Sequence, residues 1–208
     1  MALYMDSAQP EDARRAQQLG FIEAITTNPI LVAKAGRPGL ELLAEILDIF
    51  EGPVFYQVSG DTPEACIDAA WEAYQVHPGR VIIKIPVTLD NLAIVPRLSG
   101  IDVAITAVFS PAQAYLAAQA GALYVAPYVN RITRAGGDGP ATVRQMVEAV
   151  RDTKTEIVAA SIKTVEETLA VLRAGAHHLT LPLDLIEAMA DHTLSRQAIE
   201  EFDRLQPA

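Results

Sequence analysis

The chain has 208 residues, half of them hydrophobic and a fifth charged, which is enough apolar sequence for one sizeable core. Its formal net charge of −10 argues against nucleic acid or an anionic membrane surface as a partner. The chain has a lone cysteine (Cys66), which fits a reducing compartment. It has no apolar run of about 18 residues and no basic N-terminal leader, so we expect a soluble, cytoplasmic protein.

Short aliphatic runs alternate with amphipathic stretches along the chain. The eight runs are 2–7, 24–28, 54–59, 81–86, 103–109, 123–129, 156–161 and 178–183. Thr62-Pro63, Ser110-Pro111-Ala112-Gln113 and Thr164-Val165-Glu166-Glu167 are typical of helix starts. Eight strand–helix units predict an α/β fold, a (β/α)8 TIM barrel in a single domain (1–208), with 194–205 as an additional C-terminal helix.

The eight runs separate into two faces, because side chains alternate along a strand. One face is aliphatic and is expected to contact the helices. The other is small or polar and is expected to point into the barrel: Tyr4, Asp6, Ala24, Thr26, Asn28, Phe55, Gln57, Ser59, Lys84, Ala104, Thr106, Ala126, Tyr128, Asn130, Ala159, Ser161 and Thr180. Its polar members gather at the carboxyl ends of the strands, which form the catalytic face of such barrels.

Lys84 lies inside the aliphatic run VIIKIPVT (81–88). An amine removed from water has a lowered pKa, and at about 7–8 it can attack a carbonyl to form a Schiff base. That chemistry needs groups that move protons, which Asp6, Tyr128, Thr106 and Gln57 offer, and it requires no metal or other cofactor. Alternatively, a lysine at a strand end extends its charge into water.

Five segments of the chain, in the same order, resemble the transaldolase family in its short fructose-6-phosphate aldolase branch. They are AITTNP (24–29), VIIKIPVT (81–88), ITAVFSPAQA (105–114), YVAPYVNRI (124–132) and AASIKT (159–164). The likeness extends from LYMDS near the start to LPLD at 181–184. The resemblance implies a (β/α)8 barrel and a cofactor-free class I aldolase whose Schiff-base lysine, on the fourth strand, is Lys84.

The resemblance also implies a role for each site residue. Lys84 would bind the carbonyl of a dihydroxyacetone unit, and Asp6 would move protons at the substrate hydroxyls. Tyr128, Thr106 and Gln57 would hold and activate water. The expected substrate-binding residues are Thr26, Asn28 and Phe55 at the donor and Arg131, Ser161 and Lys163 at the acceptor's phosphate. For Arg131 and Lys163, the alternative is a surface ion pair.

Two positions favour the aldolase over the transaldolase reaction. Family transaldolases usually carry Phe at the position of Tyr128 and an acidic residue at that of Gln57. Ala104 departs from both branches, which leaves donor preference open. A transaldolase is the alternative prediction, and a non-enzymatic sugar-phosphate-binding barrel is the third.

The expected partners are sugar phosphates and ketone donors, with no nucleic acid and no membrane. By resemblance the protein is a homo-oligomer, a decamer of two pentamers in which 194–205 packs on a neighbouring subunit. His177 and His178 are adjacent, so they point to opposite faces of a strand and predict no metal site. His178 shares the parity of Thr180 and is expected in the lower barrel interior.

Overall fold

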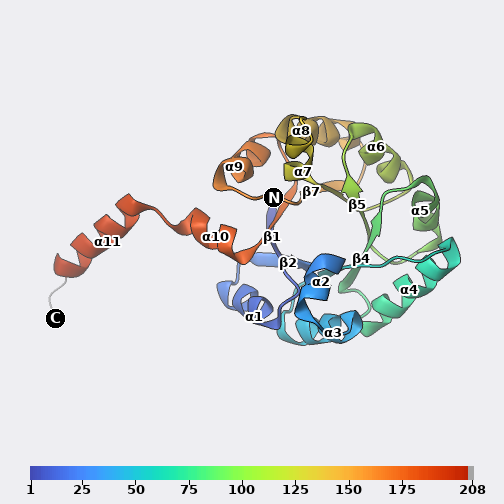
Figure 1. The fold of residues 1–208 in the computed structure, drawn as a ribbon, viewed down its shortest axis with the longest axis horizontal. Helices are drawn as coiled ribbons and strands as arrows, with labels where there is room; N and C mark the ends of the chain where they lie inside the picture. The colour runs from blue at the N-terminus through green and yellow to red at the C-terminus, as the bar shows by residue number, and fades with distance from the viewer. Residues whose placement is uncertain (206–208) are drawn as a thin grey trace.

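The computed structural model, which describes residues 1–205, contains a closed barrel of eight parallel strands that pair in chain order (Figure 1). The strands are β1 (Ala2–Asp6), β2 (Ile22–Thr26), β3 (Val54–Gln57), β4 (Val81–Pro86), β5 (Val103–Val108), β6 (Tyr124–Pro127), β7 (Glu156–Ala159) and β8 (His178–Leu181). The predicted (β/α)8 fold class is confirmed. Seven of the eight strands end one or two residues before the predicted end, where loops begin or where a residue such as Asn28, Tyr128 or Pro182 is already the N-cap of the next helix.

Helices cover the outside of the strand ring. They are α1 (Pro10–Leu19), α2 (Pro29–Ala35), α3 (Gly39–Ile49), α4 (Pro63–Val76), α5 (Leu89–Ile94), the 3-10 turn η1 (Val95–Arg97), α6 (Pro111–Gln119), α7 (Val129–Arg134), α8 (Gly139–Val150), α9 (Val165–Arg173), α10 (Leu183–Ala190) and α11 (Thr193–Leu205). The three predicted helix starts are confirmed: the hydroxyls of Thr62, Ser110 and Thr164 each accept a backbone N–H of the first turn.

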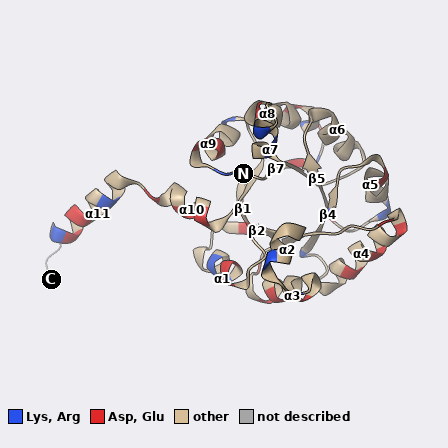
Figure 2. Ribbon diagram, in the orientation of Figure 1, with Lys and Arg blue, Asp and Glu red and all other residues tan. Residues whose placement is uncertain are grey.

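Two separate apolar layers hold the barrel together. The larger lies between strands and helices and contains outward residues such as Ile83, Ile85 and Ile105. The smaller fills the barrel interior with Ala2, Tyr4, Ala24, Phe55, Ile82, Ala104 and Val158. Charged residues lie mostly on the surrounding helices and loops (Figure 2). The two predicted faces of the strands therefore exist, with one exception at β7.

Aromatic rings close the amino-terminal end of the interior. His178 stacks on Tyr4 with ring centroids 4.9 Å apart and meets Tyr124 edge-on. Its Nε2 lies 2.9 Å from Glu156 Oε2. The expected place of His178 in the lower interior is confirmed, and the functional cavity must open at the opposite, carboxyl end.

Three predicted inward residues lie elsewhere. Val158 belongs to the interior layer and Ala159 to the outer layer, so the predicted parity of β7 is wrong. Ala159 and Ser161 were predicted to share the inward face, but the φ of +57° at Ser161 breaks the alternation between them. Ser59 is exposed beyond the end of β3, and Asn130 lies in α7, where its Nδ2 donates to Glu167 Oε1.

The C-terminal helix α11 extends away from the barrel in Figure 1. It has no buried residue, and its apolar side chains Leu194, Ile199, Phe202 and Leu205 are exposed. The predicted helix is confirmed, and its contact with a neighbouring subunit stays a prediction. Across residues 1–205, no helix is both long and apolar enough to span a bilayer.

Candidate active site

A cavity of about 420 Å³ opens at the carboxyl ends of the strands. That volume is in the range of small-molecule sites. Ten of the eleven predicted site residues line it: Asp6, Thr26, Asn28, Phe55, Gln57, Lys84, Tyr128, Arg131, Ser161 and Lys163. The eleventh, Thr106, is fully buried and reaches the cavity only through a neighbouring side chain. These ten residues come from six strands and the loops that follow them, and Ala104 on β5 and Thr180 on β8 complete a lining to which all eight strands contribute.

Lys84 is fixed by β4, where its Cα pairs with Gln57 on β3 and Ala104 on β5. Only 6% of the residue is exposed, and Nζ donates a 2.7 Å hydrogen bond to the Thr27 carbonyl oxygen. Burial lowers the pKa of the Lys84 amine to about 8, against an opposing attraction from Asp6. The alternative that this lysine extends into water is wrong.

The lowered pKa sets a pH dependence for any reaction of the amine. Only the neutral amine is a nucleophile, so the rate of adduct formation with a ketone should rise with pH and level off above about 8. Stopped-flow or quenched-borohydride measurements between pH 6 and 10 would test this. A midpoint near 10.5, the ordinary lysine value, would show that burial does not activate Lys84.

Asp6 ends β1 and faces the same cavity. Burial raises the pKa of its carboxyl group, and the nearby amine of Lys84 partly offsets that rise. Thr26 Oγ1 donates to Asp6 Oδ1 at 2.9 Å and lies 2.6 Å from Thr180 Oγ1. A carboxyl group held in this way, with a raised pKa, can take up and return a proton during a reaction.

Polar atoms that could hold a water molecule lie on the β5–β6 and β3 sides. Thr106 Oγ1 donates to the Tyr128 hydroxyl oxygen at 3.3 Å, so Thr106 orients Tyr128 from behind. Gln57 Oε1 is buried and accepts no hydrogen bond from the described residues. A buried acceptor without a partner is costly unless a water or ligand satisfies it.

The predicted donor-side residues Asn28 and Phe55 have different structural roles. Asn28 Oδ1 caps α2 by accepting from the backbone N–H groups of Ile30 and Leu31, both at 3.1 Å. That contact fixes the side chain and uses only its oxygen. Phe55 is buried in the interior layer, with its ring centroid 5.0 Å from that of Tyr124, and forms part of the cavity floor.

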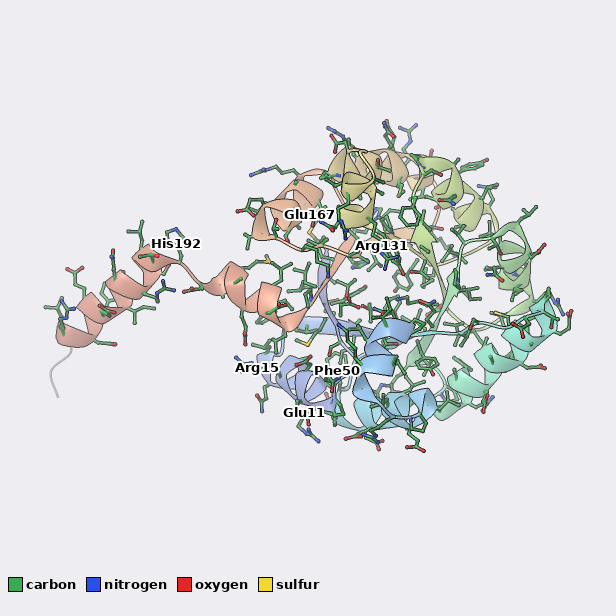
Figure 3. The ribbon with its side chains drawn as sticks, in the orientation of Figure 1. Glu11, Arg15, Phe50, Arg131, Glu167 and His192 are labelled. Carbon is green, nitrogen blue, oxygen red and sulfur yellow. The ribbon has the colours of Figure 1, made fainter. Side chains whose placement is uncertain are left out.

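Arg131, Ser161 and Lys163 line the opposite side of the cavity. The Arg131 guanidinium lies 4.7 Å from the centroid of the Tyr128 ring, and Figure 3 shows Arg131 at the barrel opening. Arg131 and Lys163 form no ion pair with a carboxylate of the described chain, so the donors of both are available to an anion. The interpretation of Arg131 as a surface ion pair is wrong.

Strained backbone also gathers at this cavity. In residues 1–205 the non-glycine residues with positive φ are Ala107 and Ser161, both at +57°, and both line it. Such conformations cost about 1–3 kcal/mol each and persist where the surrounding structure imposes them, which is common at functional sites. At Ala107, the strain coincides with a register shift between Thr106 and Val108.

The sequence analysis missed Lys34 and did not select Thr180 as a site residue. Both line the cavity. Lys34 lies four residues after Ile30 and three after Leu31, a spacing that places all three on one face of α2. That spacing was the available signal. Within residues 1–205 no three His, Cys, Asp or Glu side chains are grouped to hold a metal ion.

Comparison with known proteins gives concordant matches over almost the whole chain. Residues 3–207 match the family model described as Transaldolase/Fructose-6-phosphate aldolase. A protein named "Probable transaldolase" from Desulforudis audaxviator (strain MP104C) is 40% identical over 206 residues, 97% of this chain and 95% of the relative. One with the same name from Alkaliphilus metalliredigens (strain QYMF) is 38% identical, covering 97% and 96%. The solved thiamine phosphate pyrophosphorylase from Pyrococcus furiosus shares the fold alone, with a TM-score of 0.62 and 16% identity over 87% of this chain and 85% of that one.

Proposed function

The chain belongs to the transaldolase/fructose-6-phosphate aldolase family, and from that premise we propose that it is a lysine-dependent aldolase. It would cleave, or form, the C3–C4 bond of fructose 6-phosphate or a similar ketose phosphate, giving dihydroxyacetone and glyceraldehyde 3-phosphate. The observation that carries this proposal is the buried amine of Lys84, with its pKa lowered to about 8 at the centre of the cavity.

In the proposed reaction, the lone pair of Lys84 Nζ attacks the C2 carbonyl and a water molecule leaves, which forms an iminium ion. Asp6 takes the proton of the C4 hydroxyl as the C3–C4 bond breaks, and the bonding electrons move into the iminium to give an enamine and the aldehyde. Protonation at C3 restores the iminium. Water then adds to C2, and the amine departs with release of dihydroxyacetone.

The Tyr128 and Gln57 side chains support the final hydrolysis. The Tyr128 hydroxyl, oriented by Thr106, and the unpartnered Gln57 Oε1 offer a water two hydrogen-bonding partners. On the acceptor side, Arg131, Ser161 and Lys163 supply hydrogen-bond donors for the phosphate, and arginine suits a bidentate contact with it. This is how a chain with a net charge of −10 would bind an anionic sugar.

A transaldolase is the second candidate, because both relatives described above carry that name. In that reaction the enamine stays bound to Lys84 until it adds to the aldehyde of an aldose phosphate, and the dihydroxyacetone unit is not released by hydrolysis. Incubation with fructose 6-phosphate alone separates the two, since an aldolase accumulates free dihydroxyacetone and glyceraldehyde 3-phosphate. If products appear only when an aldose phosphate is added, the transaldolase reading replaces the first.

The Tyr128→Phe variant tests the proposed role of the hydroxyl. Removing it should slow release of free dihydroxyacetone by about 10²-fold or more, while transfer to an added aldose phosphate falls much less. Product ratios from the natural protein and the variant, measured with and without the acceptor, check this. Equal losses in both reactions would assign Tyr128 to C–C bond cleavage and not to water activation.

A further inference from the structure

The residues that would hold the acceptor phosphate come from two separate segments of the chain. Arg131 lies in α7, after β6, whereas Ser161 and Lys163 lie in the loop between β7 and α9. Arg131 and Lys163 are both exposed, and long cationic side chains lose much conformational freedom when they are fixed. The two segments must therefore be held in one arrangement if a single phosphate is to contact all three residues.

Backbone hydrogen bonds join the two segments only as far as Ser161. The N–H of Val129 donates to the Ala160 carbonyl oxygen, and that of Asn130 donates to the Ser161 carbonyl oxygen, both at 3.0 Å. The positive φ of Ser161 then turns the chain. Among the described residues, no backbone hydrogen bond joins α7 to the loop after Ser161, so these bonds do not fix the position of Lys163.

The carboxylate of Glu167, in α9, makes the next connection between the segments. Its Oε1 accepts from Asn130 Nδ2 at 3.1 Å, and its Oε2 accepts from the backbone N–H of Lys163 at 2.8 Å. Since Asn130 directly precedes Arg131, this one side chain is bonded next to both cations. Hydrogen bonds to a charged acceptor are stronger than those between neutral groups. Figure 3 shows Glu167 and Arg131 on the same side of the barrel opening.

An ordinary helix cap does not explain this geometry. Thr164 and Glu167 have the spacing of a capping box, in which the glutamate accepts the backbone N–H of the N-cap residue. The Thr164 hydroxyl does accept the N–H of Glu167, at 3.1 Å. The glutamate, however, accepts the N–H of Lys163, one residue earlier, and its other oxygen accepts from Asn130 in α7. The carboxylate therefore makes a tertiary contact between the segments that follow β6 and β7.

We propose that Glu167 is a positioning residue for the acceptor phosphate. By bonding the residue before Arg131 and the backbone of Lys163, it holds the two cations at the spacing that one phosphate needs. The inference rests on the proposed function, which assigns the phosphate to Arg131, Ser161 and Lys163. Glu167 does not line the cavity, and both of its oxygens already accept hydrogen bonds, so it acts through its neighbours. It affects the use of phosphorylated aldehydes and leaves the chemistry of Lys84 unchanged.

The test compares glyceraldehyde 3-phosphate with glyceraldehyde as acceptors for dihydroxyacetone, by measuring the ketose formed. In Glu167→Ala, kcat/KM for the phosphorylated acceptor should fall about tenfold, which corresponds to about 1.4 kcal/mol of lost binding, while kcat/KM for glyceraldehyde stays unchanged. Glu166→Ala is the matched control. It removes an exposed carboxylate from the same turn of α9, with a similar effect on the helix dipole, but neither hydrogen bond of Glu167. It should change neither value.

An exchange of the two side chains that conserves charge tests the contact itself. Glu167→Gln alone sets an amide donor against one of the two N–H donors, and Asn130→Asp alone sets two carboxylates together, so each should lower the preference for the phosphorylated acceptor. In the double variant, the glutamine amide can donate to the aspartate while its oxygen accepts from Lys163, so the preference should return. A double variant no better than Glu167→Gln, or equal losses with both acceptors in Glu167→Ala, would overturn the inference.

Borohydride trapping of dihydroxyacetone on Lys84 distinguishes failure of this inference from failure of the proposed function, because that donor carries no phosphate. Normal trapping together with an unchanged acceptor preference in Glu167→Ala would overturn the role of Glu167 and leave the aldolase intact. If the natural protein did not prefer the phosphorylated acceptor, the proposed phosphate contacts would be contradicted, and the role of Glu167 with them. A natural protein that neither traps dihydroxyacetone nor forms a ketose would contradict the aldolase and this inference together.

Discussion

Replacing Lys84 with methionine is expected to lower kcat for ketose phosphate cleavage by about 10⁴-fold or more, because no other described lysine is buried in the cavity. Methionine has nearly the length of the lysine side chain and keeps its apolar contacts in the barrel. It lacks the amine that would form the Schiff base. The measurement is a coupled assay for glyceraldehyde 3-phosphate, and turnover within tenfold of the natural protein would contradict a covalent role for Lys84.

The same variant should be more stable than the natural protein at pH 7. An amine whose pKa falls from 10.5 to about 8 on folding binds its proton more weakly in the folded state, a cost of about 3 kcal/mol below pH 8. Loss of the hydrogen bond to the Thr27 carbonyl offsets about 1 kcal/mol of the gain. Since the unfolded chain holds the proton longer, stability of the natural protein rises with pH between about 8 and 10.5.

Urea unfolding of both proteins at several pH values checks the sign. We expect Lys84→Met to be about 2 kcal/mol more stable at pH 7, and its advantage should shrink as the pH approaches 10.5. A variant that is inactive and also less stable at pH 7 would indicate a lost structural contact. Inactivity with increased stability separates a functional lysine from a structural one.

Replacing Asp6 with asparagine is expected to lower kcat by about 10²- to 10⁴-fold, the usual contribution of a general acid–base group. Asparagine retains an oxygen that can accept the hydrogen bond from Thr26 Oγ1, so the local geometry should persist. The carboxylate of Asp6 also raises the pKa of Lys84. In the variant that pKa should fall further, and the pH midpoint for adduct formation should move below about 8.

Measuring adduct formation and cleavage separately in the Asp6→Asn variant distinguishes a role of Asp6 in proton transfer from a structural role. Adduct formation with dihydroxyacetone should remain while cleavage of fructose 6-phosphate is lost. Asp152→Asn, at an exposed aspartate in the loop between α8 and β7, is the control and should change neither. If Asp6→Asn retained full cleavage activity, another group would have to accept the proton of the C4 hydroxyl.

Much of this site was readable from sequence because strand parity and barrel closure restrict the possibilities. An inward lysine in the fourth of eight strands must lie in the barrel interior, and there Lys84 lies, paired with Gln57 and Ala104. The prediction failed where the backbone leaves the strand: Ala159 and Asn130 were misplaced by a positive φ at Ser161 and by the start of α7. Alternation along a strand cannot anticipate either event.

Residues that reach the cavity from helices were the hardest to find. Lys34 lies in α2, a helix of only seven residues, and not in a strand. The alternation of side chains along a strand therefore cannot predict where it points. Thr106 shows that a correctly predicted inward direction does not guarantee contact with the cavity. Its side chain points inward as predicted, but Tyr128 lies between it and the cavity. The family resemblance supplied roles for the strand residues and also for Arg131, Ser161 and Lys163 beyond the strand ends, and the structure was needed to find Lys34.

Borohydride trapping tests the central claim most directly. The protein is incubated with dihydroxyacetone or fructose 6-phosphate, reduced with sodium borohydride, digested and analysed by mass spectrometry. We predict one stable adduct of a three-carbon unit on Lys84, absent from Lys84→Met and formed with a pH midpoint near 8. An adduct on Lys34 or Lys163 in place of Lys84, or no adduct with any ketone donor, would contradict the proposal that this buried amine carries the chemistry.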